Sequence, residues 1–205
     1  GKQTKPGSRC DAFVNLGDLG PTFLEAAGLT PPKAMTMRSL VGLCRGEPAT
    51  DRDAVFIERE RHADVRAGHL SYPMRAVRSK DFLYVRNLRP DRWPAGDPDM
   101  LFLHGRPYGD VDTTETKDFL LAQAEDPRVR PFMERIFGKR PLEELYDLRK
   151  DPDQLTNVAA DPAYAADLAA QRTKVDAWMR ATQDPRVDPA YDGFDTFPYY
   201  GKAPK

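Results

Sequence analysis

Short segments in which apolar residues alternate with basic or polar ones stand out in the first half of the chain. Residues 54–60 (AVFIERE), 74–78 (MRAVR) and 82–86 (FLYVR) each predict a β-strand, because a period of two places successive side chains on opposite faces of a sheet. The three residues 79–81 predict a hairpin turn between the second and third strands. A fourth strand is predicted over 143–148.

In the second half of the chain, apolar residues recur mainly at the spacing of an α-helix. After Asp161-Pro162, a helix start with an N-cap and a proline at the first position, Tyr164, Leu168, Gln171, Val175 and Trp178 predict one face of a long amphipathic helix. Shorter helices are predicted over 113–124, from Asp126 to about Phe137, and around 21–28 and 39–46. The last two end at Gly28 and Gly46, residues that adopt the left-handed conformation readily.

The resulting order is a helical start, three strands, two helices, one strand and one long helix. Runs of antiparallel strands packed by helices indicate the α+β class. The first 50 residues look like the last part of a larger domain, because their helix has few packing partners in this chain.

Composition excludes several classes of protein. With 205 residues, a net charge of −1, 40% hydrophobic and 31% charged residues, the chain fits a soluble globular protein, and its overall charge does not point to nucleic acid or an anionic membrane as a partner. No apolar run approaches the roughly 18 residues of a membrane span. Cys10 and Cys44 have no zinc-site spacing, and we expect them to be unpaired and buried.

The densest ionisable cluster lies at the end of the first strand, with Glu58, Glu60, Arg61 and His62. One interpretation is that Arg61 and His62 project into a cleft and bind a sulfate, phosphate or carboxylate, since a guanidinium offers such groups two parallel hydrogen bonds. The other is a solvated, charged strand end, which composition alone favours.

Two further clusters also have two interpretations each. Arg92 and Trp93 could hold a charged sugar on an indole ring, or Trp93 could fasten its proline-rich loop to the sheet. Asp110 and Asp112 of YGDVD resemble a calcium-type pair, but without further oxygen ligands we expect helix capping. No motif for a catalytic nucleophile with its base is present.

Four blocks of sequence belong together: DAFVNLGDLGPTFLEAAGL with MTMRSL, RERH with YPMRAVRSKDFLYVRN and PDRWPAGDP, YGDVD with TKDFL, and EELYDLRKDPDQLTNVAADP. Together they resemble the C-terminal part of type I sulfatases, and YPMRAVR points to the heparan N-sulfatase (N-sulfoglucosamine sulfohydrolase) branch. Met37 stands where that family usually has glycine.

The resemblance implies a hydrolase of sulfated sugars. Such enzymes use a formylglycine made from Cys or Ser in a C/S-x-P-x-R motif and a calcium ion that polarises the sulfate. Neither Cys10 nor Cys44 opens that motif. We therefore expect the nucleophile and the calcium ligands upstream of Gly1, and no activity from this chain alone.

The resemblance also implies an organisation. Residues 1–50 would be the last elements of an alkaline-phosphatase-like α/β domain, and residues 51–205 the C-terminal sulfatase subdomain, an antiparallel sheet with packed helices. The partners would be the missing N-terminal sulfatase domain and a sulfated sugar. The compartment would be periplasmic, secreted or lysosomal.

In the intact enzyme the C-terminal subdomain would border the substrate cleft, so the resemblance favours His62 and Arg61, with Arg92 weaker, as substrate-binding residues. Three alternatives are a non-catalytic module that binds sulfated glycans, a truncated remnant, and a phosphoesterase of the same superfamily. An exposed apolar face on Phe23, Leu24 and Val41 would favour a piece of a larger core over a stand-alone module.

Overall fold

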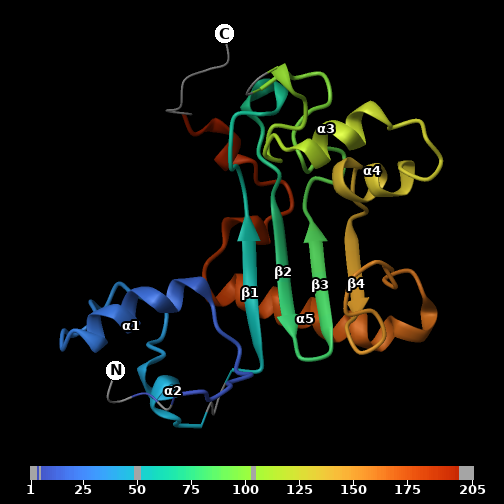
Figure 1. Ribbon diagram of the computed structural model, residues 1–205. Helices are drawn as coiled ribbons and strands as arrows, with labels where there is room; N and C mark the ends of the chain where they lie inside the picture. The colour runs from blue at the N-terminus through green and yellow to red at the C-terminus, as the bar shows by residue number, and fades with distance from the viewer. Residues whose placement is uncertain (1–3, 5, 49–51, 103–104, 199–205) are drawn as a thin grey trace. The chain divides into compact units, whose positions relative to one another are not determined.

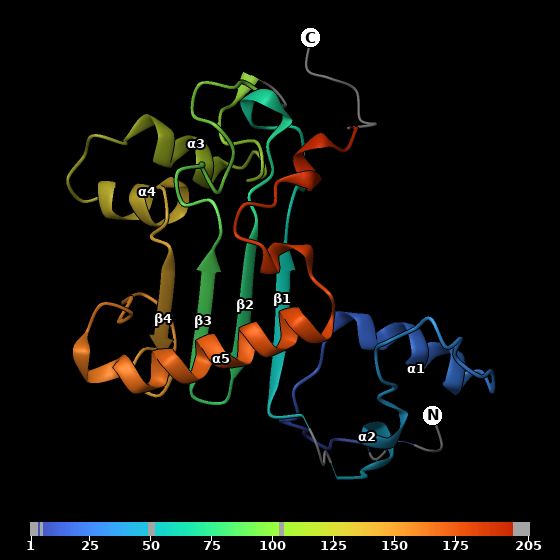
Figure 2. The ribbon, with the colours of Figure 1, turned by 180° about the vertical axis from the view of Figure 1, so that it is seen from behind.

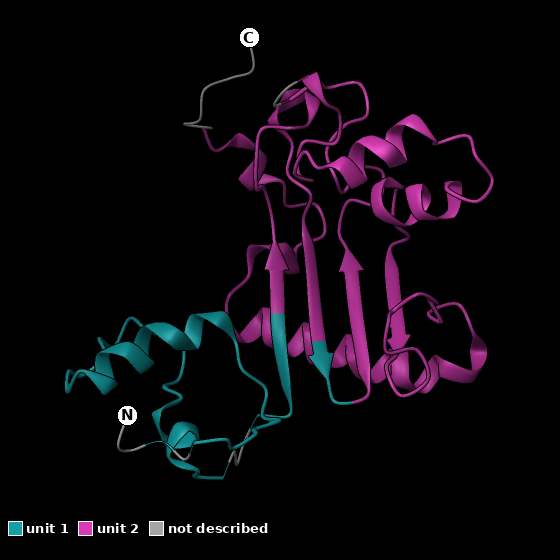
Figure 3. Cartoon of the chain, viewed as in Figure 1, with its two compact units in different colours: residues 1–56, 78–80 teal, residues 57–77, 81–205 magenta. Residues whose placement is uncertain are grey.

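The computed structural model describes residue 4 and residues 6–48, 52–102 and 105–198. The chain forms two compact units, one made of residues 1–56 and 78–80 and the other of 57–77 and 81–205 (Figure 3). The proposed assignment of residues 1–50 to a larger α/β domain and of 51–205 to a C-terminal subdomain stays a prediction.

The centre of the fold is a four-stranded antiparallel sheet with the order β1-β2-β3-β4 (Figure 1). The strands are β1 (Ala54–Arg59), β2 (Met74–Ser79), β3 (Phe82–Asn87) and β4 (Glu143–Asp147). The register of β3 against β4 pairs Tyr84 with Leu145. All four strands lie where the alternating pattern predicts them, which confirms the α+β class.

One face of the sheet carries the long helix α5 (Ala165–Ala181), seen crossing the strands in Figure 2. Its N-terminus follows a 3₁₀ turn, η4 (Pro162–Tyr164), for which the Asp161 carboxylate accepts a hydrogen bond from Ala163 N at 2.9 Å, as predicted. The buried residues of α5 are Leu168, Gln171, Val175 and Met179. The predicted face ended on Trp178, but the structure buries Met179, because it lies one turn beyond Val175 at i+4.

A second core lies under α3 (Glu115–Ala122) and α4 (Arg130–Phe137), where Ala95, Leu120, Val129 and Phe137 are buried together. Helix α3 agrees with its prediction. Helix α4 begins at Arg130 and not at Asp126, because the Asp126 carboxylate binds Arg128 N at 2.8 Å and closes a turn first. This core fixes the loop that contains Ala95, which belongs to the candidate site.

The first unit contains η1 (Leu16–Asp18), α1 (Leu19–Ala26) and α2 (Val41–Arg45). Asp18 is fully buried and is held by an ion pair with Arg52. Leu40 N donates to Thr22 Oγ1 at 2.8 Å, which ties the start of α2 to α1. Gly46 ends α2 with a φ of 88°, as its position predicts. Further short 3₁₀ segments, in the second unit, include η2 (Ala67–His69), η5 (Pro185–Val187) and η6 (Gly193–Thr196).

Two sequence-based expectations about this unit need correction. Phe23 is 66% exposed, but Leu24 is half-buried and Val41 is buried, because the tie between Leu40 and Thr22 brings α2 onto α1. Cys10 and Cys44 are free, as expected, but both are exposed. None of the helices in the described part of the chain is long and apolar enough to cross a membrane.

The turn after β4 contains a carboxylate whose charge is stabilised by folding. Asp147 accepts hydrogen bonds from Arg149 Nε and Nη2, both at 2.8 Å, and the Arg149 contact is the main cause that lowers the pKa of Asp147 to about 2. A carboxyl group with a pKa below its unfolded value of about 3.9 stabilises the fold above that value and loses this contribution as the pH falls toward 2. We expect Asp147→Asn to show a weaker pH dependence of the unfolding free energy between about pH 4 and pH 2.

Urea denaturation at stepped pH measures this slope. Asp153→Asn is the matched control, because Asp153 is exposed and lies in the same turn region; its slope is expected to equal that of the parent chain. Equal slopes for the parent and Asp147→Asn would contradict the assignment.

Candidate functional site

The long loops of the second unit meet at one end of the sheet. Strands β1 and β3 end there and β2 and β4 begin there (Figure 1). The segments 60–73 and 88–102 and the approach to α3 therefore lie close together, although the sequence separates them. The candidate site lies in this loop cluster.

Asp110 is the centre of the cluster. Its carboxylate accepts from Arg59 Nη2 at 2.5 Å and from Arg66 Nη2 at 2.6 Å, and His62 Nδ1 lies 3.2 Å from it. The side chains of Asp110 and Arg66 are 2% and 1% exposed, so this is a buried ion pair. We call Asp110, Arg59, Arg66 and His62 the Asp110 hub.

The hub orients the His62 ring. A carboxylate only accepts hydrogen bonds, so the His62 nitrogen that faces Asp110, Nδ1, is the one that carries the proton. The side chain of His62 is 71% exposed. Its Nε2 edge is therefore available to an incoming group, as an acceptor in the neutral ring and as a donor in the protonated one.

Backbone hydrogen bonds between loops place Asp110. Asp110 N donates to Ala95 O at 3.0 Å, Tyr108 N to Asp97 O at 3.3 Å, and Asp97 N to Val65 O at 2.9 Å. These bonds connect the loop after β1 to two parts of the segment that runs from β3 to α3. The Asp110 carboxylate is thus set by three segments that lie far apart in sequence.

Two glycines permit this close approach. Gly96 has a φ of 97°, and a Cβ there would lie 2.9 Å from Gly109 N. A Cβ on Gly109 would overlap Val65 Cγ1. Both positions require glycine, the first for its backbone angle as well as its size.

Arg66 ties the Trp93 loop to the hub. It donates from Nε to Trp93 O at 2.7 Å and from Nη2 to Pro94 O at 2.8 Å. Burial lowers the pKa of the Arg66 guanidinium, while the charge of Asp110 acts in the opposite direction. Its Nη1 is buried and has no hydrogen-bond partner among the described residues, a state that costs free energy unless an acceptor is supplied.

Two cavities border the hub. The larger, of about 600 Å³, is lined among others by Arg66, Arg92, Trp93 and Lys139. Lys139 Nζ lies 5.1 Å from the centre of the Trp93 ring. Asp91, Asp97 and Asp99 also line it, so its charge is mixed. The smaller, of about 300 Å³, has Arg59, Asp110, Arg140 and Glu144 among its lining residues.

The structure separates the three predicted substrate-binding residues. His62 belongs to the hub. Arg61 turns to a different neighbourhood, where it donates to His69 O at 2.9 Å and to Phe197 O at 2.8 Å. Arg92 lines the larger cavity but also binds Ser71 O at 2.9 Å and pairs with Asp195 at 2.8 Å. Their role in substrate binding stays a prediction.

Sequence reasoning missed the rest of the hub. It assigned Asp110 to helix capping, which is wrong, because Thr114 caps α3 by accepting from Lys117 N at 3.1 Å. Arg59 and Arg66 lie 51 and 44 residues from Asp110, so no local spacing connects them. The glycines beside Ala95 and Asp110, in PAGDP and YGDVD, are the one local signal of a close loop contact.

Metal binding has no support from the geometry. Within residues 6–48, 52–102 and 105–198, no group of three or more His, Cys, Asp or Glu side chains is placed to hold a metal ion. The hub carboxylate is already neutralised by two arginines. The described residues do not fit a calcium ion.

The chain is similar to known proteins over most of its length. It is 26% identical over 186 residues to an ulvan-active sulfatase of Formosa agariphila, covering 89% of this chain and 32% of that protein. It is 29% identical over 190 residues to human N-sulphoglucosamine sulphohydrolase, covering 88% of this chain and 35% of that protein. The chain thus spans about a third of the length of these relatives. No protein-family model matches it.

A solved structure shows the same fold. A protein of Bacteroides fragilis assigned to the sulfatases superposes with a TM-score of 0.52 at 14% sequence identity, over 92% of this chain and 30% of that one. At this identity the likeness concerns the fold alone. The sheet with its packed helices therefore occurs within a much longer protein.

Proposed function

We propose that this sulfatase homologue serves as the C-terminal part of an enzyme that removes sulfate from sulfated sugars. The relatives confirm the resemblance read from the sequence. The observation that carries the proposal for this chain is the Asp110 hub, which orients the exposed His62 ring and whose Arg66 lines the larger cavity together with Arg92, Trp93 and Lys139. This end of the sheet would form one wall of the substrate cleft.

The chemistry of the larger cavity suits a sulfated sugar. An indole face packs against a sugar ring, and guanidinium and ammonium groups bind a sulfate. Lys139 and Trp93 are already adjacent. Arg66 also lines this cavity, and its buried Nη1 has no hydrogen-bond partner among the described residues.

We further propose N-sulfoglucosamine of heparan-type glycans as the sugar, supported by YPMRAVR and by the name of the human relative. Formylglycine and calcium would come from residues outside this chain, and we expect the chain alone to release no sulfate. The partner would be the sulfatase α/β domain that carries them. A periplasmic, secreted or lysosomal site of action is part of the same proposal.

Titration of the ¹⁵N-labelled chain with N-sulfoglucosamine, followed by NMR, tests the binding role. We expect saturable shifts of the Trp93 indole N–H and of the residues around His62, because the sulfate adds charge-assisted hydrogen bonds there. Glucosamine without sulfate is expected to cause much smaller shifts. The same samples are assayed for sulfate release, with none expected.

Variants locate the contact. His62→Ala and Lys139→Ala remove exposed side chains and are expected to weaken binding about tenfold, the effect of one charge-assisted hydrogen bond. Arg130→Ala is the control, since Arg130 is exposed and pairs with Glu134 on α4. Equal shifts by the sulfated and unsulfated sugars would refute the proposal. Tighter binding of glucosamine 6-phosphate would favour the phosphoesterase alternative.

A further inference from the structure

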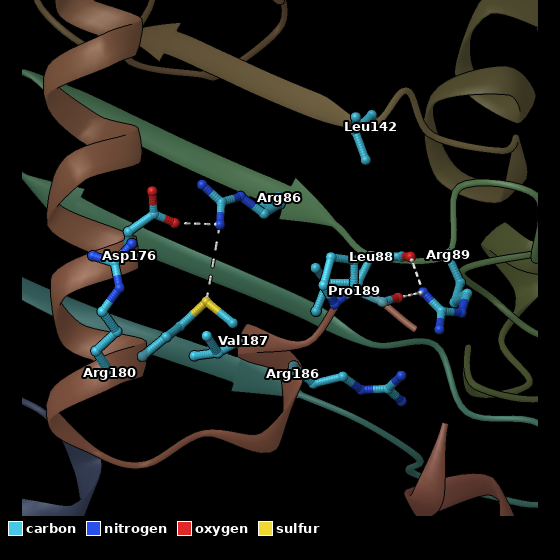
Figure 4. Close-up of a pocket in the computed structure, with 10 residues that line it drawn as sticks. Arg86, Leu88, Arg89, Leu142, Asp176, Arg180, Arg186, Val187 and Pro189 are labelled. Atoms are coloured by element: carbon cyan, nitrogen blue, oxygen red, sulfur yellow. Dashed lines mark hydrogen bonds and ion pairs between the residues drawn. The ribbon is translucent and has the colours of Figure 1, made fainter. Parts of the chain in front are cut away.

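A separate cavity of about 300 Å³ lies on the α5 face of the sheet (Figure 4). It is formed by the last turns of α5, the end of β3, the residue before β4, and the segment 186–189. It takes Arg86 from β3 and Leu88 from directly after that strand. The cavity next to Asp110 takes Val85 and Asn87 from the same strand. Because side chains alternate along a strand, the two cavities open on opposite faces of the sheet.

The walls of this cavity are mainly apolar. Met179 forms a buried part of the wall, while Leu142 and Val187 are 56% and 48% exposed. Leu88 and Pro189 complete the apolar lining. A volume of this size lies at the lower end of the range for small-molecule sites, about 300–1,000 Å³. The size and the apolar lining of the cavity therefore favour a ligand with a compact apolar part.

Arginines surround these walls, and most of them are neutralised. Arg86 Nη1 lies 2.6 Å from Asp176 Oδ1 and 4.0 Å from Met179 Sδ (Figure 4). Arg89 pairs with Asp192 at 2.9 Å. Both guanidiniums therefore have a carboxylate partner, although Asp192 is shared with Arg186.

The remaining two arginines differ from each other. Arg186 is buried and pairs with Glu60 at 2.7 Å and with Asp192 at 2.8 Å. Arg180 is exposed in the last turn of α5, and within the described residues its side chain has no hydrogen-bond or ion-pair partner. Among the lining guanidiniums, Arg180 is thus the one that pairs with no carboxylate of the described residues.

We propose that this cavity binds a small organic monoanion, a carboxylate or a sulfate ester on a compact apolar body. Arg180 binds the acidic group, and Met179, Leu142 and Val187 contact the body. A single charge is preferred, because a phosphate monoester carries about −1.5 to −2 at pH 7. Its second charge would face Asp176 without a free cation to balance it. This site is independent of the proposed sulfatase function.

Hexanoate is the test ligand, with 1-hexanol and hexyl phosphate as comparisons, each titrated into the ¹³C-methyl-labelled chain by NMR. We expect hexanoate to shift the methyl signals of Met179, Leu142 and Val187 saturably. Arg180→Gln is expected to weaken binding about tenfold, the effect of one charge-assisted contact. Arg180 is exposed, so the fold of this variant should be intact, which its amide spectrum checks.

Arg130→Gln is the charge-matched control and is expected to bind hexanoate like the parent chain. Val187→Asn tests the apolar wall and is expected to weaken hexanoate binding without loss of fold. The proposal is overturned if 1-hexanol or hexyl phosphate binds as tightly as hexanoate. It is also overturned if Arg180→Gln binds hexanoate unchanged, or if the shifts lie outside this cavity. None of these outcomes bears on the sugar titration, whose signals come from Trp93 and His62.

Discussion

Asp110→Ala is expected to lower the free energy of unfolding by about 3–5 kcal/mol, the usual cost of removing one partner of a buried ion pair. Arg66 would keep its charge in a site where its side chain is 1% exposed, with backbone carbonyl oxygens as its remaining acceptors. Arg59 would lose its 2.5 Å contact at the same time. Urea denaturation at pH 7, followed by circular dichroism and tryptophan fluorescence, measures the loss.

A control separates the hub from the general effect of losing a carboxylate. Asp118→Ala removes a partly exposed aspartate that pairs with Arg106 at 2.7 Å, and solvent-accessible pairs contribute about 0–1 kcal/mol. The hub assignment predicts a further result, namely that Arg66→Leu and Asp110→Ala together cost less than the sum of the single changes. Additive losses, or a loss for Asp110→Ala no larger than for Asp118→Ala, would show that the pair is not coupled.

Arg75→Ala is expected to cost a similar amount, about 3–5 kcal/mol, at a different place in the fold. Arg75 Nε donates to Asp184 Oδ2 at 2.5 Å and Nη2 to Glu60 Oε1 at 2.8 Å. The Arg75 and Asp184 side chains are both nearly fully buried. The contact joins β2 to the segment that follows α5, so its loss should also weaken the docking of the helix end.

The pH dependence of this variant provides a second measurement. Burial by itself raises the pKa of Asp184, but the Arg75 hydrogen bond and further contacts outweigh it, so the pKa lies below its usual value. In the parent chain Asp184 therefore stabilises the fold above its unfolded pKa of about 3.9 and loses this contribution as the pH falls. Without Arg75 the carboxyl group is protonated more readily, so the deficit of Arg75→Ala should shrink on acidification from pH 7 toward pH 4.

Arg130→Ala is the matched control for Arg75→Ala, because Arg130 and Glu134 form an exposed i,i+4 pair expected to contribute about 0.3–0.5 kcal/mol. Urea midpoints at a series of pH values give both the size of the loss and its pH dependence. A deficit that grows on acidification would contradict the role assigned to Asp184.

Local pattern was a good guide to the elements of the second unit. The alternation in MRAVR and FLYVR predicted β2 and β3, and the turn between them, because the period of two is a direct consequence of strand geometry. Asp161-Pro162 predicted the start of the long helix for an equally local reason. Where the pattern was weaker, boundaries moved, as with α4, whose start was displaced by a side-chain hydrogen bond of Asp126.

The candidate site was predictable only in part. His62 and Arg61 are adjacent in sequence and were expected to act together, yet they face different neighbourhoods. Asp110 holds His62, while carbonyl groups of His69 and Phe197 hold Arg61. At an irregular strand end, neighbouring side chains point in different directions. Their hydrogen-bond partners therefore depend on which loops of the folded chain pass that end of the strand. The Phe197 contact spans 136 residues.

By itself, the sequence determined the order and type of the secondary structure, the α+β class and the relationship to sulfatases, because periodicity, caps and motif blocks are local properties of the chain. The tertiary structure alone decided that Asp110 gathers Arg59, Arg66 and His62, and that Arg75 meets Asp184 across 109 residues. Such pairs form where the chain returns to the same place, and hydrophobic periodicity carries no information about which charged residues then meet.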